Sequence, residues 1–269
     1  MVQGHYPHPE GKHPLPYPLA STIPAGPPDQ AEQPYRSRLG AVVKPGDIAT
    51  KDPYAALKHF NTVFLIDDSA SMEPYWGEVG ALLSKIAPIC TEYDPNGIDI
   101  EFLNHRARAR SFWPTTWRGY RNIGIANGVP EMRDNVLGIY RGVKPKGKGW
   151  MDSCLGDILG NSFYNYVFID YGKQNLPPLN LIVIAAGFSE DDPRKSLVET
   201  ARRLDIHKAP LHQVGVQFFL VGNQSSIHKG VNRIPYIDDQ LFLDEGVRDI
   251  ADTVTWTGKK PGELGTFGE

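Results

Sequence analysis

From residue 52 onward the chain alternates short apolar runs with amphipathic stretches. The apolar runs are rich in β-branched and aromatic residues, and several lack polar alternation, as expected of strands buried on both faces. These predicted strands span residues 62–66, 98–103, 180–185 and 214–221. Predicted helices span residues 76–93, 130–140, 153–171 and 193–207. The alternation predicts an α/β fold, a doubly wound and mostly parallel central sheet flanked by helices in a Rossmann-like arrangement.

Local signals support the last part of this pattern. Pro193 follows Asp191 and Asp192, as a first-turn proline follows acidic capping residues, and this marks a helix start. The segment GVRDIADTVTW, residues 246–256, predicts a final short element packed against the sheet.

The two ends of the chain have a different composition. Residues 1–50 are rich in Pro, Gly and His and show no apolar periodicity, so they cannot bury enough surface to offset the cost of ordering. We therefore expect a disordered N-terminal tail at 1–50, one domain at 52–257 and a flexible tail at 258–269.

Composition and charge narrow the class of protein. The formal net charge of −3 over 269 residues gives no global attraction to nucleic acid or to an anionic membrane. Cys90 and Cys154 are far apart and form no metal-binding or redox spacing. The N-terminus lacks the apolar core of a signal peptide, and no run is long enough to span a bilayer. These features predict a cytoplasmic protein with neither nucleic acid nor membrane as a partner.

The first predicted strand ends in FLIDDSASM, residues 64–72, where carboxylates and hydroxyls follow the apolar run. Asp67, Ser69 and Ser71 alternate in a pattern that can supply oxygen ligands to Mg²⁺. Aspartyl phosphatases of the dehalogenase type need a second acid where this chain has Ser69, and a serine-nucleophile turn needs flanking glycines that are missing. Alternatively, Ser69 and Ser71 cap the helix that follows, while Asp68 faces water.

The Asp-x-Ser-x-Ser spacing resembles the metal-ion-dependent adhesion site of von Willebrand factor type A domains. The segments that carry the wider resemblance are DPYAALKHFNTVFLIDDSASM, EYDPNGIDIEFLNH, PLNLIVIAAGFSEDDP, LHQVGVQFFLVG and VRDIADTVTW. Together they resemble cytosolic fungal and bacterial proteins with this domain, over residues 52–257. The resemblance implies a site for Mg²⁺ or Mn²⁺ whose coordination is completed by a carboxylate of a partner protein.

The family site draws on three loops, which this sequence matches unequally. The first loop is intact in Asp67, Ser69 and Ser71. In the second loop the family has a threonine, and the resemblance implies Ser153 in its place, with Asp152 as a substitute. The third loop of the family ends its strand in Thr-Asp-Gly, whereas here Ala186 replaces the aspartate. Two later carboxylates are candidates to compensate, those of Glu190 and Asp191.

A basic and aromatic segment, HRARARSFWPTTWRGYR at residues 105–121, follows the second predicted strand. Arginines interleaved with aromatic rings can pair with carboxylates or phosphates and stack on flat groups. The candidate partner-binding residues are Arg106, Arg108, Arg110, Trp113 and Trp117. The alternative is an extension at the sheet edge whose aromatic rings pack on the domain while its arginines are solvated.

These observations predict a non-enzymatic module that binds a protein partner, through an acidic residue of that partner, with or without a divalent cation. The alternative is a metal-assisted phosphate-ester hydrolase that uses Asp67 as ligand or nucleophile. Such an enzyme needs a general base and a deep pocket, and the sequence points to neither.

Overall fold

The computed structural model describes residues 52–107, 119–124, 135–170, 176–187, 189–222, 237 and 239–256. These residues fall within one compact unit, Ser37–Glu269. The tails predicted at 1–50 and 258–269 lie outside the described residues.

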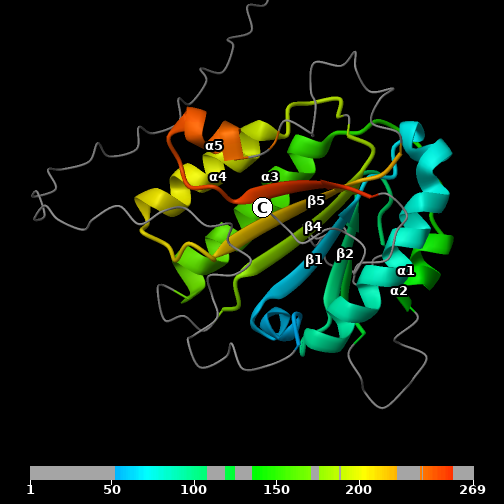
Figure 1. Cartoon of the computed structure of the whole chain (residues 1–269), viewed down its shortest axis with the longest axis horizontal. Helices are drawn as coiled ribbons and strands as arrows, with labels where there is room; N and C mark the ends of the chain where they lie inside the picture. The colour runs from blue at the N-terminus through cyan, green and yellow to red at the C-terminus, as the bar shows by residue number, and fades with distance from the viewer. Residues whose placement is uncertain are drawn as a thin grey trace, which may run out of the picture. The chain divides into compact units, whose positions relative to one another are not determined.

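A central sheet organises the described part of the chain (Figure 1). Its six strands lie in the order β3-β2-β1-β4-β5-β6. Their bounds are β1 Asn61–Ile66, β2 Ile98–Phe102, β3 Tyr120–Ile123, β4 Leu179–Ala185, β5 Val214–Leu220 and β6 Ala251–Thr255. All neighbouring strands pair in parallel except β2 and β3, which are antiparallel. The predicted mostly parallel, doubly wound fold is confirmed.

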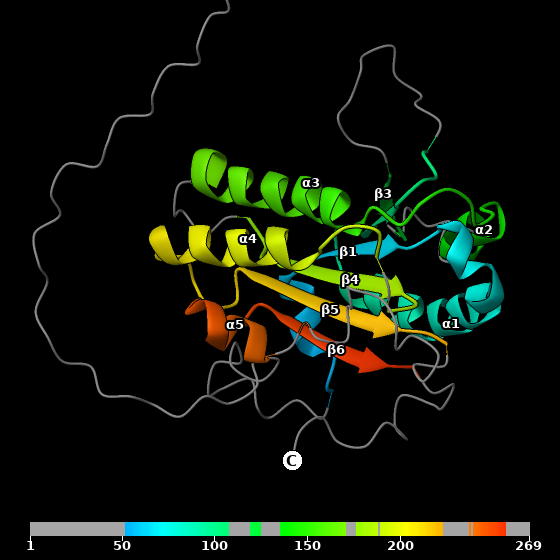
Figure 2. The ribbon, with the colours of Figure 1, turned by 90° about the horizontal axis from the view of Figure 1, so that it is seen from above.

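Helices cover both faces of this sheet, with α3 and α4 on one face and α1 and α2 on the other (Figure 2). Their bounds are α1 Trp76–Tyr93, α2 Asn135–Arg141, α3 Met151–Tyr164, α4 Arg194–Ile206 and α5 Asp239–Glu245. Short 3₁₀ helices, η3 at Ala55–His59 and η4 at Ala70–Tyr75, precede β1 and α1. A π-helical segment, η6 at Asn165–Asp170, extends α3.

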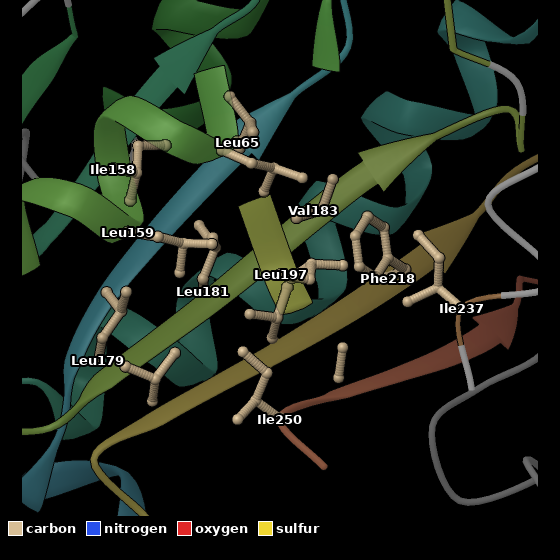
Figure 3. Close-up of a cluster of buried hydrophobic side chains, with 14 of the residues drawn as sticks. Leu65, Ile158, Leu159, Leu179, Leu181, Val183, Leu197, Phe218, Ile237 and Ile250 are labelled. Atoms are coloured by element: carbon tan, nitrogen blue, oxygen red, sulfur yellow. The ribbon is translucent and has the colours of Figure 1, made fainter. Parts of the chain in front are cut away.

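Alternating residues of the central strands supply two apolar cores. Leu65 of β1 and Val183 of β4 point to the α3 and α4 face, where they pack with Leu197 and Phe218 (Figure 3). Their neighbours Phe64, Ile182 and Ile184 belong to a second cluster with α1. Because β1 and β4 are buried on both faces, they form near-continuous apolar runs, which is why the sequence predicts them well.

The strand order reverses between β1 and β4. From β1 the chain proceeds outward to β2 and β3, and from β4 it proceeds the other way to β5 and β6. Ligands of doubly wound folds bind outside the carboxyl ends of the strands at such a reversal. The segment that follows β1, beginning at Asp67, lies there.

Several predicted bounds differ from the structure. Helix α3 begins at Met151 rather than at 153, and its α-helical part ends at Tyr164 rather than at 171. Pro193 is the N-cap residue of α4 rather than a residue of its first turn. Strand β3 and helix α5 were not predicted, whereas the final element was and is strand β6. Among the helices of the described residues, none is long and apolar enough to cross a membrane.

Candidate binding site at the carboxyl edge of the sheet

Polar residues follow β1 at the strand reversal, and most of them are buried. The N–H of Asp67 donates to the carbonyl of Ile184 at 2.9 Å, which continues the pairing of β1 with β4 by one residue. Asp67, Asp68 and Ser69 are almost fully shielded from solvent, whereas Ser71 is exposed. Buried carboxylates are costly unless they have partners. The partners of each one therefore indicate its role.

The hydroxyls of Ser69 and Ser71 interact with each other. Their Oγ atoms lie 2.9 Å apart, and the Ser69 N–H donates to Oδ1 of Asp67 at 2.9 Å. Ser69 is the N-cap residue of η4, but its side chain makes no capping hydrogen bond. The interpretation of Ser69 as a helix cap is therefore wrong. The three residues form a carboxylate and hydroxyl cluster, with Ser71 at its exposed side.

The Asp67 carboxyl is buried behind this hydroxyl pair. Burial raises its pKa to about 6, hydrogen bonds from Ser69 oppose the shift, and the nearby Asp68 adds to it. The midpoint of its titration therefore lies about one pH unit below neutral, and at pH 7 most of the group is ionised. A group so placed gains from any partner that supplies positive charge or hydrogen-bond donors.

Asp68 has a different role from the one expected. One oxygen accepts the main-chain N–H of Asn104 at 2.7 Å and its amide Nδ2 at 3.3 Å, while the other accepts the N–H of His105 at 2.8 Å. The expectation that Asp68 faces water is wrong, because its side chain is 0 % exposed. Asp68 fixes the loop that leaves β2 against the loop that leaves β1.

The loop between α2 and α3, residues 142–150, lies directly beside this cluster, and we call it the basic loop because it carries three lysines. The N–H of Lys146 donates to the Asp68 carbonyl at 2.7 Å, and the N–H of Ala70 donates to the Gly147 carbonyl at 3.1 Å. A Cβ atom on Gly149 would lie 3.5 Å from Ser69 Oγ and 3.8 Å from Asp67 Oδ2. Gly149 therefore lies close to the site, although the sequence did not suggest it.

Ser153 is the residue that the resemblance implies for the second loop of the site. It is exposed in the first turn of α3, and its N–H donates to Asp191 Oδ2 at 3.2 Å. Within the described residues no contact joins its hydroxyl to the Asp67 cluster. Asp67, Ser69 and Ser71 are thus brought together, and the role implied for Ser153 stays a prediction.

Two of the three less certain candidate carboxylates, Asp191 and Asp152, cap helices. Asp191 Oδ1 accepts the N–H of Asp152 at 2.9 Å and the Ser189 hydroxyl at 2.6 Å, which caps the start of α3. Asp152 Oδ1 in turn accepts the N–H of Ser196 at 2.9 Å, in the first turn of α4. Both carboxylates therefore have a structural role as helix caps. The third candidate, Glu190, donates its N–H to the Gly149 carbonyl at 2.9 Å and has an exposed side chain.

The end of β4 adds no polar side chain to the site. Ala186 is 8 % exposed and packs in the apolar cluster on the α1 face, which also contains Ile66 and Met72. Gly187 follows with a φ of 83°, a conformation that favours glycine.

These donors fit a resident Mg²⁺ or Mn²⁺ poorly. The cluster supplies one carboxyl and two hydroxyls, whereas Mg²⁺ demands near-octahedral oxygen coordination. Both oxygens of Asp68 already accept N–H groups, and Asp152 and Asp191 cap helices. Across the described ranges no group of three or more His, Cys, Asp or Glu residues is placed to share an ion.

The arginine segment is described only at its two ends. The Arg106 guanidinium donates to the carbonyls of Phe102, Leu103 and His105 at 2.8 to 3.0 Å. Arg106 therefore satisfies main-chain carbonyls at the carboxyl end of β2 and in the residues that follow it. The other candidate partner-binding residues, Arg108, Arg110, Trp113 and Trp117, lie outside the described residues. At the far end of the segment, Tyr120 begins the edge strand β3.

His105 links the two ends of this segment. Its Nε2 lies 2.8 Å from the Tyr120 hydroxyl, and the two rings are nearly parallel. Burial lowers the pKa of His105, Asp68 opposes that shift, and the charges of Lys146 and Arg106 add to it. Lys146 of the basic loop and Arg106 thus both place positive charge near His105, at the carboxyl edge of the sheet.

Comparison with known proteins adds no family assignment: neither the protein-family models nor the curated proteins gave a match to the chain.

Proposed function

We propose that this chain is a binding module similar to a von Willebrand factor type A domain, which recognises a protein partner through the carboxyl edge of its sheet. The observation that carries the proposal is the cluster at the strand reversal. There the Ser69 and Ser71 hydroxyls pair with each other beside a buried Asp67, although neither interaction is needed to cap the helix. An exposed hydroxyl backed by a buried carboxyl can donate to an acidic side chain of a partner.

Binding is favoured over the phosphate-ester hydrolase alternative by the helix ends at this edge. Phosphate groups bind at free helix N-termini, where N–H groups and the helix dipole attract negative charge. Here Asp191 accepts N–H groups at the start of α3, and Asp152 accepts one at the start of α4. The N-termini of α3 and α4 are therefore already satisfied by carboxylates.

Quantitative affinity capture tests this proposal. Immobilised wild-type protein is compared with Ser71→Leu, which places a bulky side chain on the exposed side of the cluster, and with Ser84→Leu on the exposed face of α1. Captured proteins are quantified by mass spectrometry in Mg²⁺ and in EDTA. We expect one set of proteins to be retained by the wild type and by Ser84→Leu but lost by Ser71→Leu. Identical capture by all three would refute the proposal.

The hydrolase alternative has its own assay. Hydrolysis of p-nitrophenyl phosphate is measured for the wild type and for Asp67→Asn. Activity that is present in the wild type and absent in Asp67→Asn would support catalysis instead of binding. We expect no difference between the two proteins.

A further inference from the structure

The basic loop is anchored by its main chain, and its lysine side chains extend into solvent. Hydrogen bonds hold Lys146 N–H, the Gly147 carbonyl and the Lys148 carbonyl to Asp68, Ala70 and Asn104, respectively. The Gly149 carbonyl accepts from Met151, Glu190 and Ser189. The loop is therefore fixed on three sides by its neighbours, which lowers the entropy cost of presenting its side chains to a partner.

The lysines of this loop have no carboxylate partner in the described part of the chain. Lys144, Lys146 and Lys148 are all exposed, and none takes part in a salt bridge there. Lys148 Nζ instead lies 5.5 Å from the centre of the Trp150 ring, and this ring is 49 % exposed. Three unpaired cations and an exposed indole thus lie together on a rigid loop.

We propose that the basic loop, through Lys144, Lys146, Lys148 and Trp150, binds an acidic segment of the partner protein, and that the Ser69 and Ser71 hydroxyls receive one carboxylate of that segment. This inference rests on the proposed function and specifies the chemistry of the partner. The main chain of the basic loop borders the hydroxyl cluster, since the Lys146 N–H and the Gly147 carbonyl are hydrogen-bonded to Asp68 and Ala70. The lysines attract the carboxylates, and Trp150 offers a flat apolar surface to a neighbouring side chain.

A short acidic peptide fits this surface better than a nucleic acid does. Base stacking on single strands uses successive aromatic side chains, whereas the loop offers one exposed ring.

Fluorescence anisotropy with a labelled dodecamer of glutamate tests the inference on the full chain at low ionic strength. The variant Lys144→Gln, Lys146→Gln, Lys148→Gln removes the charge of the loop. A matched control, Lys58→Gln, Lys85→Gln, Lys208→Gln, removes the same charge from η3, α1 and the end of α4. We expect the loop variant to bind at least about tenfold more weakly than the wild type, and the control to bind within about twofold of it.

Three further ligands complete the test: a dodecamer of glutamine, a twelve-residue oligothymidine and vesicles that contain phosphatidylserine. We expect glutamine not to bind, and the two anions to bind more weakly than glutamate. Equal loss of glutamate binding in both triple variants, or no glutamate binding, would overturn the inference. Tighter binding of oligothymidine or vesicles that depends on the loop would also overturn it. If Ser71→Leu still abolishes partner capture in any of these cases, the proposed function stands and only the chemistry of the partner is wrong.

Discussion

Asp68 is the buried carboxylate on which the shape of the carboxyl edge depends. It accepts two main-chain N–H groups of the loop after β2, and one amide N–H of Asn104, while its own side chain is inaccessible to solvent. Asp68→Ala leaves these donors without an acceptor. Hydrogen bonds to a charged group contribute about 1.5–3 kcal/mol each, so we expect the loss of the two short ones to cost roughly 3–6 kcal/mol.

The isosteric change Asp68→Asn separates hydrogen bonding from volume. The amide keeps one acceptor oxygen but turns an NH₂ group toward one of the main-chain donors, so we expect a cost of about 2–3 kcal/mol. The matched control is Glu199→Gln, which removes the same charge from an exposed pair with Arg203 and should cost no more than about 0.5 kcal/mol.

Urea unfolding, monitored by circular dichroism, gives the free energy of unfolding of both variants. Amide hydrogen exchange reports the local effect. The amides of Asn104 and His105 should lose protection in Asp68→Asn, whereas the amides of β4 should keep theirs when compared at equal global stability. The reasoning is refuted if Asp68→Asn is no less stable than Glu199→Gln and the two amides remain protected.

Three other perturbations address the same edge. Because the pKa of folded Asp67 is raised to about 6, the folded state holds this proton more tightly than the unfolded state, and stability should rise as pH falls from 7 to 4. Urea unfolding should show that Asp67→Asn removes roughly 2–3 kcal/mol of this dependence, and an unchanged slope would contradict the assignment. Ala186→Asp buries a carboxyl and should cost about 2–4 kcal/mol, with Mg²⁺ raising its melting temperature but not that of Ala186→Asn. A wild type that responds to Mg²⁺ as strongly would show that the donor set binds metal after all. Arg106→Ala should cost about 1–3 kcal/mol in urea unfolding because three carbonyls lose their donor, and a cost no greater than that of the exposed Arg202→Ala would contradict this.

The sequence predicts the central strands well because they are buried on both faces and are therefore apolar throughout. It does not predict β3, whose residues Tyr120–Ile123 are mostly polar and lie at the sheet edge. Helix α5 is equally hard to predict from the sequence, since its seven residues make barely two helical turns. Strands and helices that bury more apolar surface are thus easier to predict from the sequence.

Within the site, the residues adjacent in sequence could be predicted and the distant partners could not. Asp67, Ser69 and Ser71 belong to one short motif, and their side chains do come together. The role of Asp68 depends on N–H groups 36 and 37 residues away, for which the sequence carries no signal. Gly149 was overlooked because it has no side chain, although a glycine-rich stretch before a helix is the kind of pattern that accompanies close backbone approach.

Site-specific photo-crosslinking tests the central claim most directly. A photoreactive amino acid at position 71 lies on the exposed side of the carboxylate and hydroxyl cluster, and the same group at position 84 lies on α1 as a control. The account predicts that position 71 forms a discrete covalent complex with a partner protein in cell extract, and that excess unlabelled wild type suppresses it while position 84 forms none. Crosslinking that is equal at both positions, or that is unaffected by the competitor, would contradict it.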